Sequence, residues 1–161
     1  MTPLPAPHPY DQDTGGGGNG DAHHAASDSN ASDPRTQGLI LLLEDNLDEA
    51  EPLRDMLRFA GYVCVIARSK ARAREELEKP DQRFSIMLAD LNLATNDDCA
   101  FVREARSLPD YATLPVIITS GHSSHEAREQ ARLLGRTEYL VKPFSTDVLL
   151  QLIARWTRAK S

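Results

Sequence analysis

Short apolar runs recur along the chain from residue 38 onward and predict buried β-strands. They cover residues 39–43, 62–67, 84–89, 116–119 and 139–141. Each run is too short for a helix, and uninterrupted apolar character is typical of strands in a parallel sheet that is covered on both faces. The pattern therefore predicts five strands in the interior of the fold.

Stretches with a helical spacing of apolar residues separate these runs. They cover residues 48–60, 69–79, 98–107, 124–134 and a final stretch that starts at Ser145. Gly61 suits the left-handed position that follows a helix, and Ser145 is a favourable N-cap. Strands that alternate with helices predict an α/β fold, here a flavodoxin-like, doubly wound, five-stranded parallel sheet of the (βα)5 type.

Reactive side chains follow four of the five predicted strands. The residues at these strand ends are Glu44-Asp45, Asp90, Ser120-Gly121 and Lys142-Pro143. In an open parallel sheet, ligands bind beyond the carboxyl ends of the strands, near the point where the strand order reverses. The second run has no such residue at its end, which favours a place at the sheet edge and the strand order 2-1-3-4-5.

The first 37 residues differ in composition from the rest. They hold five of the ten prolines, five of the nine glycines and five aspartates, with few large apolar side chains. Such a segment cannot bury enough apolar surface to offset the entropy of ordering it. We therefore predict a disordered, Pro/Gly/Ser/Asp-rich N-terminal tail over residues 1–37 and one folded domain over residues 38–161.

The charge of the chain argues against a nucleic-acid partner. The formal net charge is −6 and the isoelectric point is near 5.3, whereas binding to a phosphate backbone needs clustered Lys and Arg. No apolar run approaches a membrane span, and the N-terminus lacks the basic-then-apolar order of a signal peptide. We expect a cytoplasmic protein without a nucleic-acid or membrane partner.

The residues at the predicted strand ends form a set with a definite chemistry. Glu44, Asp45 and Asp90 are expected to lie close together, and three such carboxylates repel one another unless a cation lies among them. Oxygen ligands with room for water suit Mg²⁺ better than zinc. With the Lys142 ammonium and the Ser120 hydroxyl added, these are the parts needed to accept a phosphoryl group as an aspartyl phosphate.

At these positions the sequence resembles the receiver domain of the two-component response-regulator family. The resemblance covers residues 38–161 and rests on four motifs, Leu-Leu-Leu-Glu44-Asp45-Asn46, Ile-Met-Leu-Ala-Asp90-Leu-Asn92-Leu, Pro-Val-Ile-Ile-Thr-Ser120-Gly121 and Tyr139-Leu-Val-Lys142-Pro143-Phe. The intervals between the motifs also match. The resemblance implies a phosphoprotein of signal transduction that is not an enzyme, beyond catalysing its own phosphorylation and dephosphorylation.

The resemblance also implies roles for the residues around the acceptor. It makes Asp90 the phosphoacceptor, Asp45 the direct Mg²⁺ ligand and Glu44 a mainly water-mediated one. Asn92 would contribute its backbone carbonyl to the cation, and Lys142 would pair with Asp90 or its phosphoryl group. The family further implies a cis peptide bond after Lys142.

Two further residues take the role of a conformational switch by the same resemblance. Ser120 would be the switch hydroxyl, and Tyr139 the aromatic side chain that changes rotamer. His122 would overhang the pocket entrance and, with Asn92, tune the access of attacking water.

The loop after Asp90 departs from the family pattern. Ala94 stands where most members have Pro, and Asp98 stands where they have Gly. A Gly there is suited to a left-handed conformation, which Asp adopts only at some cost. We therefore expect a reshaped or looser loop in this chain.

The resemblance implies a partner that supplies the phosphoryl group. A sensor histidine kinase or a histidine phosphotransfer protein would donate it, and a downstream protein would read the result. Only five residues follow Trp156, so we expect a stand-alone regulator, monomeric or weakly dimeric, without its own output domain. Output regulator and phosphorelay intermediate remain equally open.

Three alternative functions use a similar fold or a similar set of residues. An Asp-nucleophile phosphohydrolase of the haloacid-dehalogenase type carries Asp-x-Asp after its first core strand, whereas here the candidate nucleophile follows the third strand and Asn92 holds the second position. A flavodoxin-like cofactor binder is disfavoured because the acidic Glu44-Asp45 loop would repel a flavin phosphate. A receiver-like interaction module without phosphate cycling remains open.

Overall fold

The computed structural model describes residues 37–158, which form five parallel strands and five α-helices in strict alternation. The predicted tail, apart from Gln37, lies outside the described residues. The elements are β1 Leu39–Leu43, α1 Leu47–Phe59, β2 Val63–Ala67, α2 Lys70–Glu78, β3 Ile86–Asp90, α3 Asn96–Ser107, the 3-10 turn η1 Pro109–Tyr111, β4 Val116–Ser120, α4 His125–Leu134, β5 Thr137–Val141 and α5 Thr146–Arg158.

The strands form one parallel sheet in the order β2-β1-β3-β4-β5. This confirms the predicted flavodoxin-like fold and the placement of β2 at an edge. Because β1 and β3 are neighbours, the polar residues that follow them are brought to the same end of the sheet.

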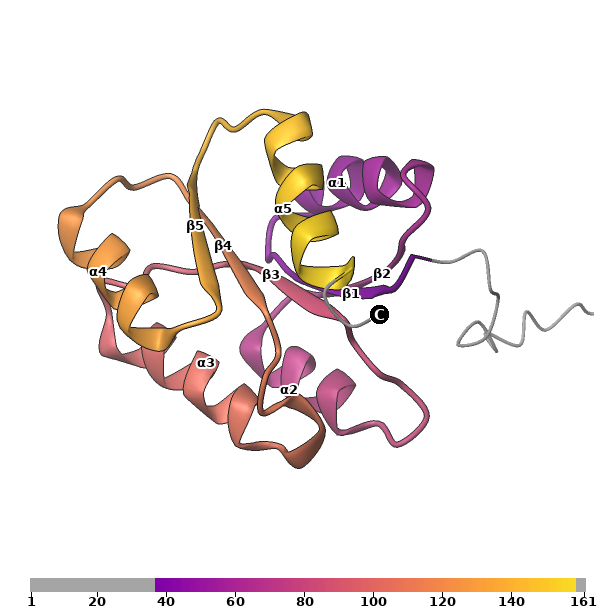
Figure 1. Ribbon diagram of the computed structural model, residues 1–161, viewed down its shortest axis with the longest axis horizontal. Coiled ribbons are helices and arrows are strands. Elements are labelled where there is room, and N and C mark those ends of the chain that lie inside the picture. The colour runs from indigo at the N-terminus through magenta and orange to yellow at the C-terminus, as the bar shows by residue number, and fades with distance from the viewer. Residues whose placement is uncertain (1–36, 159–161) are drawn as a thin grey trace, which may run out of the picture.

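Helices cover both faces of the sheet (Figure 1). α1 and α5 pack on one face, where Leu57 and Ile153 are fully buried in one core cluster. α2, α3 and α4 pack on the other face, where Phe101 and Val102 belong to a second cluster. Strands buried on both faces explain why the strand segments read as continuous apolar runs.

Some element boundaries differ from the prediction. The third strand begins at Ile86, and Phe84 is buried in the preceding loop, where the Tyr111 hydroxyl accepts a hydrogen bond from its amide at 3.4 Å. A buried loop residue thus extended the apolar run. The fifth strand begins two residues earlier than predicted, at Thr137, which pairs with Val116.

The partly buried guanidinium of Arg106 connects the end of α4 to α3 and β5. Arg106 of α3 donates hydrogen bonds of 2.8–3.1 Å to the carbonyls of Leu114, Leu134, Gly135 and Arg136 and to the hydroxyl of Thr137. Burial lowers the pKa of Arg106 to about 10, and the neighbouring Arg136 adds to the shift. The carbonyls of Leu134, Gly135 and Arg136 lie at the end of α4, where helical carbonyls lack partners within the helix. The chain turns there through positive φ angles, 62° at Gly135 and 46° at Arg136.

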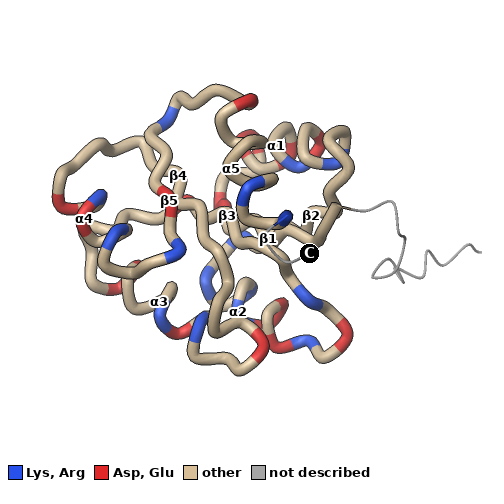
Figure 2. The backbone as a smooth tube through the Cα atoms, in the orientation of Figure 1, with Lys and Arg blue, Asp and Glu red and all other residues tan. Residues whose placement is uncertain are grey.

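The surface carries charges of both signs. Figure 2 shows Lys and Arg interspersed with Asp and Glu over the helices. Between α2 and α3, for example, Arg74 forms a two-pronged ion pair with Glu104, with one arm at 2.7 Å. Among residues 37–158, none of the helices combines the length and the apolar character that a bilayer-spanning helix requires.

Candidate functional site

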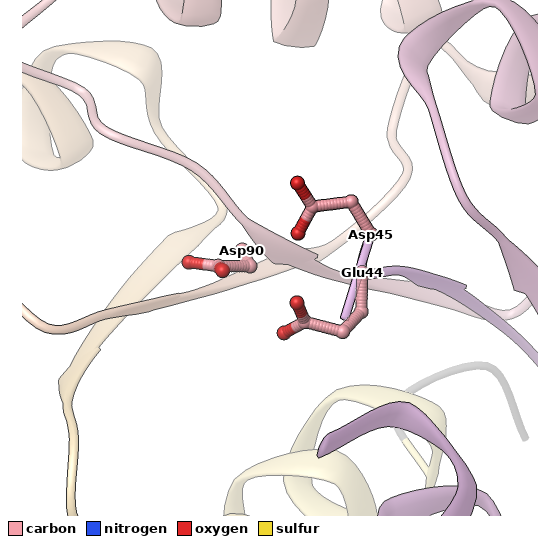
Figure 3. Close-up of side chains that lie close together, drawn as sticks. All are labelled: Glu44, Asp45 and Asp90. Atoms are coloured by element: carbon pink, nitrogen blue, oxygen red, sulfur yellow. The ribbon is translucent and has the colours of Figure 1, made fainter. Parts of the chain in front are cut away.

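Three carboxylates converge at the carboxyl end of the sheet. Glu44 and Asp45 directly follow β1, and Asp90 is the last residue of β3. One oxygen from each lies within 4.8 Å of the others, and the three side chains point into a common space (Figure 3). The structure thus brings together the acidic cluster that the sequence predicted.

The three acids have different environments. Glu44 is 4% exposed, Asp90 is half-buried and Asp45 is open to solvent. Burial raises the pKa of Glu44 above its ordinary value. The Asn46 amide, which donates to Glu44 Oε1 at 3.1 Å, opposes the shift, and the Asp90 charge adds to it. The surroundings of Glu44 thus disfavour its charged form, chiefly through burial.

The donor set fits a hard divalent cation. Carboxylate oxygens are the ligands that Mg²⁺ prefers, and the exposed side of the cluster at Asp45 leaves room for the waters that Mg²⁺ retains. A dication among the three oxygens would also offset the burial and the Asp90 charge that together raise the pKa of Glu44.

Lys142 supplies the positive charge at the cluster. It follows β5, and its amide donates to the Ser120 carbonyl at 2.8 Å, which extends the pairing of β4 with β5. Its Nζ lies 3.4 Å from Asp90 Oδ2 and 3.3 Å from Glu44 Oε2. The peptide bond between Lys142 and Pro143 is cis, as the family resemblance implied.

A third carboxylate that contacts Lys142, beside those of Glu44 and Asp90, was not predicted from the sequence. Glu49, in the first turn of α1, accepts a hydrogen bond from Lys142 Nζ at 2.5 Å. Burial acts to lower the pKa of Lys142, but the hydrogen bond to Glu49 and the charges of Asp90 and Glu44 outweigh it and hold that pKa above its ordinary value. The only signal in the sequence was the spacing Asn46-x-x-Glu49, which is also that of a helix cap.

The loop after Asp90 is held by its own hydrogen bonds. The Asn92 carbonyl, a predicted metal ligand, accepts bonds from both the amide and the hydroxyl of Thr95, each at 2.9 Å. A carbonyl oxygen has two lone pairs, so a metal contact there requires one of these bonds to be given up. The Asn92 side chain accepts from the Ala94 amide at 3.1 Å.

Asp98 does not occupy the left-handed position on which the expectation of a reshaped or looser loop rested. Arg136 is the one non-glycine residue with a positive φ in the described part of the chain, and Asp98 lies in the first turn of α3. This helix starts two residues earlier than predicted because the Thr95 hydroxyl caps it. The Asp98 carboxylate accepts a hydrogen bond from the Asn92 amide at 2.6 Å and pairs with Lys70 of α2. The Asp98 carboxylate therefore anchors the loop that follows Asp90 to α2 and α3.

We expect the exchange of the Asn92 amide hydrogen with solvent to depend on Asp98. In Asp98→Ala this amide loses its acceptor, so its exchange measured by NMR should accelerate by about tenfold. Asp97→Ala is the matched control, because Asp97 is also in the first turn and also pairs with Lys70. Equal exchange rates in the two variants would show that Asp98 does not hold the loop.

Two predicted switch residues meet at the backbone of His122. The Ser120 hydroxyl, 2% exposed, accepts a hydrogen bond from the His122 amide at 3.2 Å. The half-buried Tyr139 donates its hydroxyl to the His122 carbonyl at 2.5 Å, and the Arg128 guanidinium lies 5.6 Å from its ring centroid. The His122 side chain itself is exposed.

Comparison with known proteins gives a consistent result. The family described as response regulator receiver domain matches residues 40–154. The transcriptional regulatory protein ZraR of Escherichia coli is 32% identical over 110 residues, which make up 68% of this chain and 24% of ZraR. The chain thus spans about a quarter of the length of the first curated relatives that it matches.

Solved structures show the same likeness. The receiver domain of the sensor histidine kinase PA1611 from Pseudomonas aeruginosa is 29% identical, with a TM-score of 0.63 over 75% of this chain and 98% of that one. It contains a magnesium ion coordinated in its active site cleft. The chemotaxis protein CheY4 of Vibrio cholerae is 25% identical, with a TM-score of 0.64 over 73% of this chain and 96% of that one.

Proposed function

Because the chain belongs to the response regulator receiver domain family of two-component signal transduction, we propose that it accepts a phosphoryl group on Asp90 from a phosphohistidine of a partner protein. Receiver domains typically work with histidine kinases, and a histidine phosphotransfer protein is the other candidate donor. The observation that carries this proposal is the position of Asp90, whose carboxylate lies beside both Glu44 and Asp45 and 3.4 Å from the Lys142 ammonium.

The proposed transfer is an in-line displacement at phosphorus. A carboxylate oxygen of Asp90 forms the new P–O bond while the P–N bond of the phosphohistidine breaks, and the electron pair leaves with the imidazole nitrogen. Glu44, Asp45, Asp90 and the Asn92 carbonyl would hold Mg²⁺, which neutralises charge on the phosphoryl oxygens. Lys142 would pair with a phosphoryl oxygen and hold it in line.

The phosphoryl group would then rearrange the contacts of His122. The Ser120 hydroxyl would turn toward the acyl phosphate and leave the His122 amide, and Tyr139 would leave the His122 carbonyl to fill the vacated space. This would remodel the face made by α4, β5 and α5, where a downstream protein could bind. We propose further that the side chains of His122 and Asn92 tune the access of water, and that the protein is a monomer or a weak dimer.

The test is phosphorylation by a small donor. The full chain is incubated with acetyl phosphate and Mg²⁺, and the product is digested and mapped by mass spectrometry. We expect one hydroxylamine-labile phosphate, located on Asp90, that does not form when EDTA has removed the metal beforehand. A label on another residue, or no label, contradicts the proposal and favours a receiver-like interaction module.

A further inference from the structure

The Lys142 ammonium lies closer to Glu49 of α1 than to Asp90, the proposed acceptor. Its shortest contact is with Glu49 Oε2 at 2.5 Å, whereas Glu44 and Asp90 are 3.3 and 3.4 Å away. Lys142 is 24% exposed and Glu49 is 49% exposed at the side chain. The contact is thus a charge-assisted hydrogen bond at the rim of the site.

The position of Glu49 is fixed by the start of α1. Its amide donates to the Asn46 carbonyl at 3.1 Å, and its Oε1 accepts from the Asn46 side chain at 3.3 Å. One carboxylate oxygen is therefore held by the helix cap and the other by Lys142. Glu49 does not belong to the acidic cluster of Glu44, Asp45 and Asp90, so it has no assigned part in holding a cation.

We propose that Glu49 is a positioning residue that holds the Lys142 ammonium back from Asp90 and so restrains phosphorylation. The inference rests on the proposed function, in which Lys142 pairs with a phosphoryl oxygen. An interaction accelerates a reaction only when it is stronger in the transition state than in the ground state. The bond to Glu49 already exists in the ground state, and it must lengthen as Lys142 moves toward the incoming phosphoryl group.

Three variants distinguish the effect of the contact between Glu49 and Lys142 from the effect of removing a negative charge near the site. Glu49→Gln removes the charge and keeps a side chain that suits the helix cap. Glu49→Asp keeps the charge but is shorter by about 1.5 Å, so it loses the contact with Nζ. Asp48→Asn is the matched control, because it removes a charge from the same helical turn at a residue with no bond to Lys142.

The measured quantity is the initial rate of acetyl phosphate uptake at saturating Mg²⁺. We expect both Glu49→Gln and Glu49→Asp to raise the rate by about fivefold, and Asp48→Asn by less than about twofold. In a Lys142→Met background, the effect of Glu49→Gln should shrink to that of Asp48→Asn, because the contact no longer exists. This double-mutant comparison distinguishes positioning of Lys142 from any structural effect of Glu49.

Each other outcome overturns the inference. Equal rates for Glu49→Gln and Asp48→Asn would show a general charge effect. A wild-type rate for Glu49→Asp would show that the contact is irrelevant, and a slower rate for either Glu49 variant would show that Glu49 assists the reaction. The proposed function fails separately, when the wild-type protein itself takes up no phosphate.

Discussion

Replacing Asp90 with asparagine is expected to abolish hydroxylamine-labile phosphate uptake, with a loss of at least about a thousandfold. Asparagine keeps the shape of the side chain but has no anionic oxygen to attack phosphorus. The measurement is the uptake of phosphate from acetyl phosphate under saturating Mg²⁺. Uptake by Asp90→Asn that matches the wild-type protein would assign the acceptor to another residue.

The melting temperature is a second measurement, which tests whether the Asp90→Asn variant is folded. Asp90 is one source of the raised pKa of Glu44, so its neutralisation should relieve repulsion and raise the melting temperature of the metal-free protein. Asp110→Asn is the matched control, since Asp110 is exposed and pairs with Arg83, and both residues precede strands at the end of the sheet opposite to the acidic cluster. This variant should take up phosphate at the wild-type rate.

Arg106→Met is expected to lower the free energy of unfolding by about 3 kcal/mol. Methionine fills much of the same volume but has no hydrogen-bond donor. The carbonyls at the end of α4 that accept hydrogen bonds from Arg106 therefore lose their donor. Urea denaturation monitored by circular dichroism gives the value. The change is expected in the midpoint, with an unchanged slope.

Arg132→Met is the control for this second prediction. Arg132 lies on α4 close to the same helix end, but it is exposed and forms only an ion pair with Glu129 three residues earlier. Such pairs contribute little, so the expected loss is below about 0.5 kcal/mol. If both Arg variants lost the same stability, the hydrogen bonds of Arg106 would contribute no more than the exposed ion pair of Arg132.

The architecture was predictable from sequence because each strand is buried on both faces. A continuous apolar run such as 39–43 marks a strand in this setting, and the polar residue that follows it marks the ligand-binding end. Glu44, Asp45 and Asp90 were found in this way. The predicted strand boundaries failed at Phe84, where a loop residue fills the core and carries the same hydrophobic signal as a strand.

The contacts that refine the site were not predictable from sequence. Glu49 and Lys142 are 93 residues apart, and the sequence around either residue does not indicate a contact with the other. The expectation of a reshaped or looser loop at Asp98 came from the family pattern alone, whereas the structure makes Asp98 a helical residue whose carboxylate accepts a hydrogen bond from the Asn92 amide. Both contacts depend on how the loops that follow β1, β3 and β5 fold over one another.

The backbone of His122 connects the interior of the protein to its surface. Its N–H donates to the hydroxyl of Ser120, which is almost fully buried, and its carbonyl accepts from the hydroxyl of Tyr139, which is half-exposed. The two bonds are separated by a single residue, whose backbone has only two soft dihedral angles. Under the proposed switch, a displacement of the Ser120 hydroxyl is therefore transmitted to the Tyr139 hydroxyl through the backbone of one residue, His122. The backbone resonance of His122 would report both events at once.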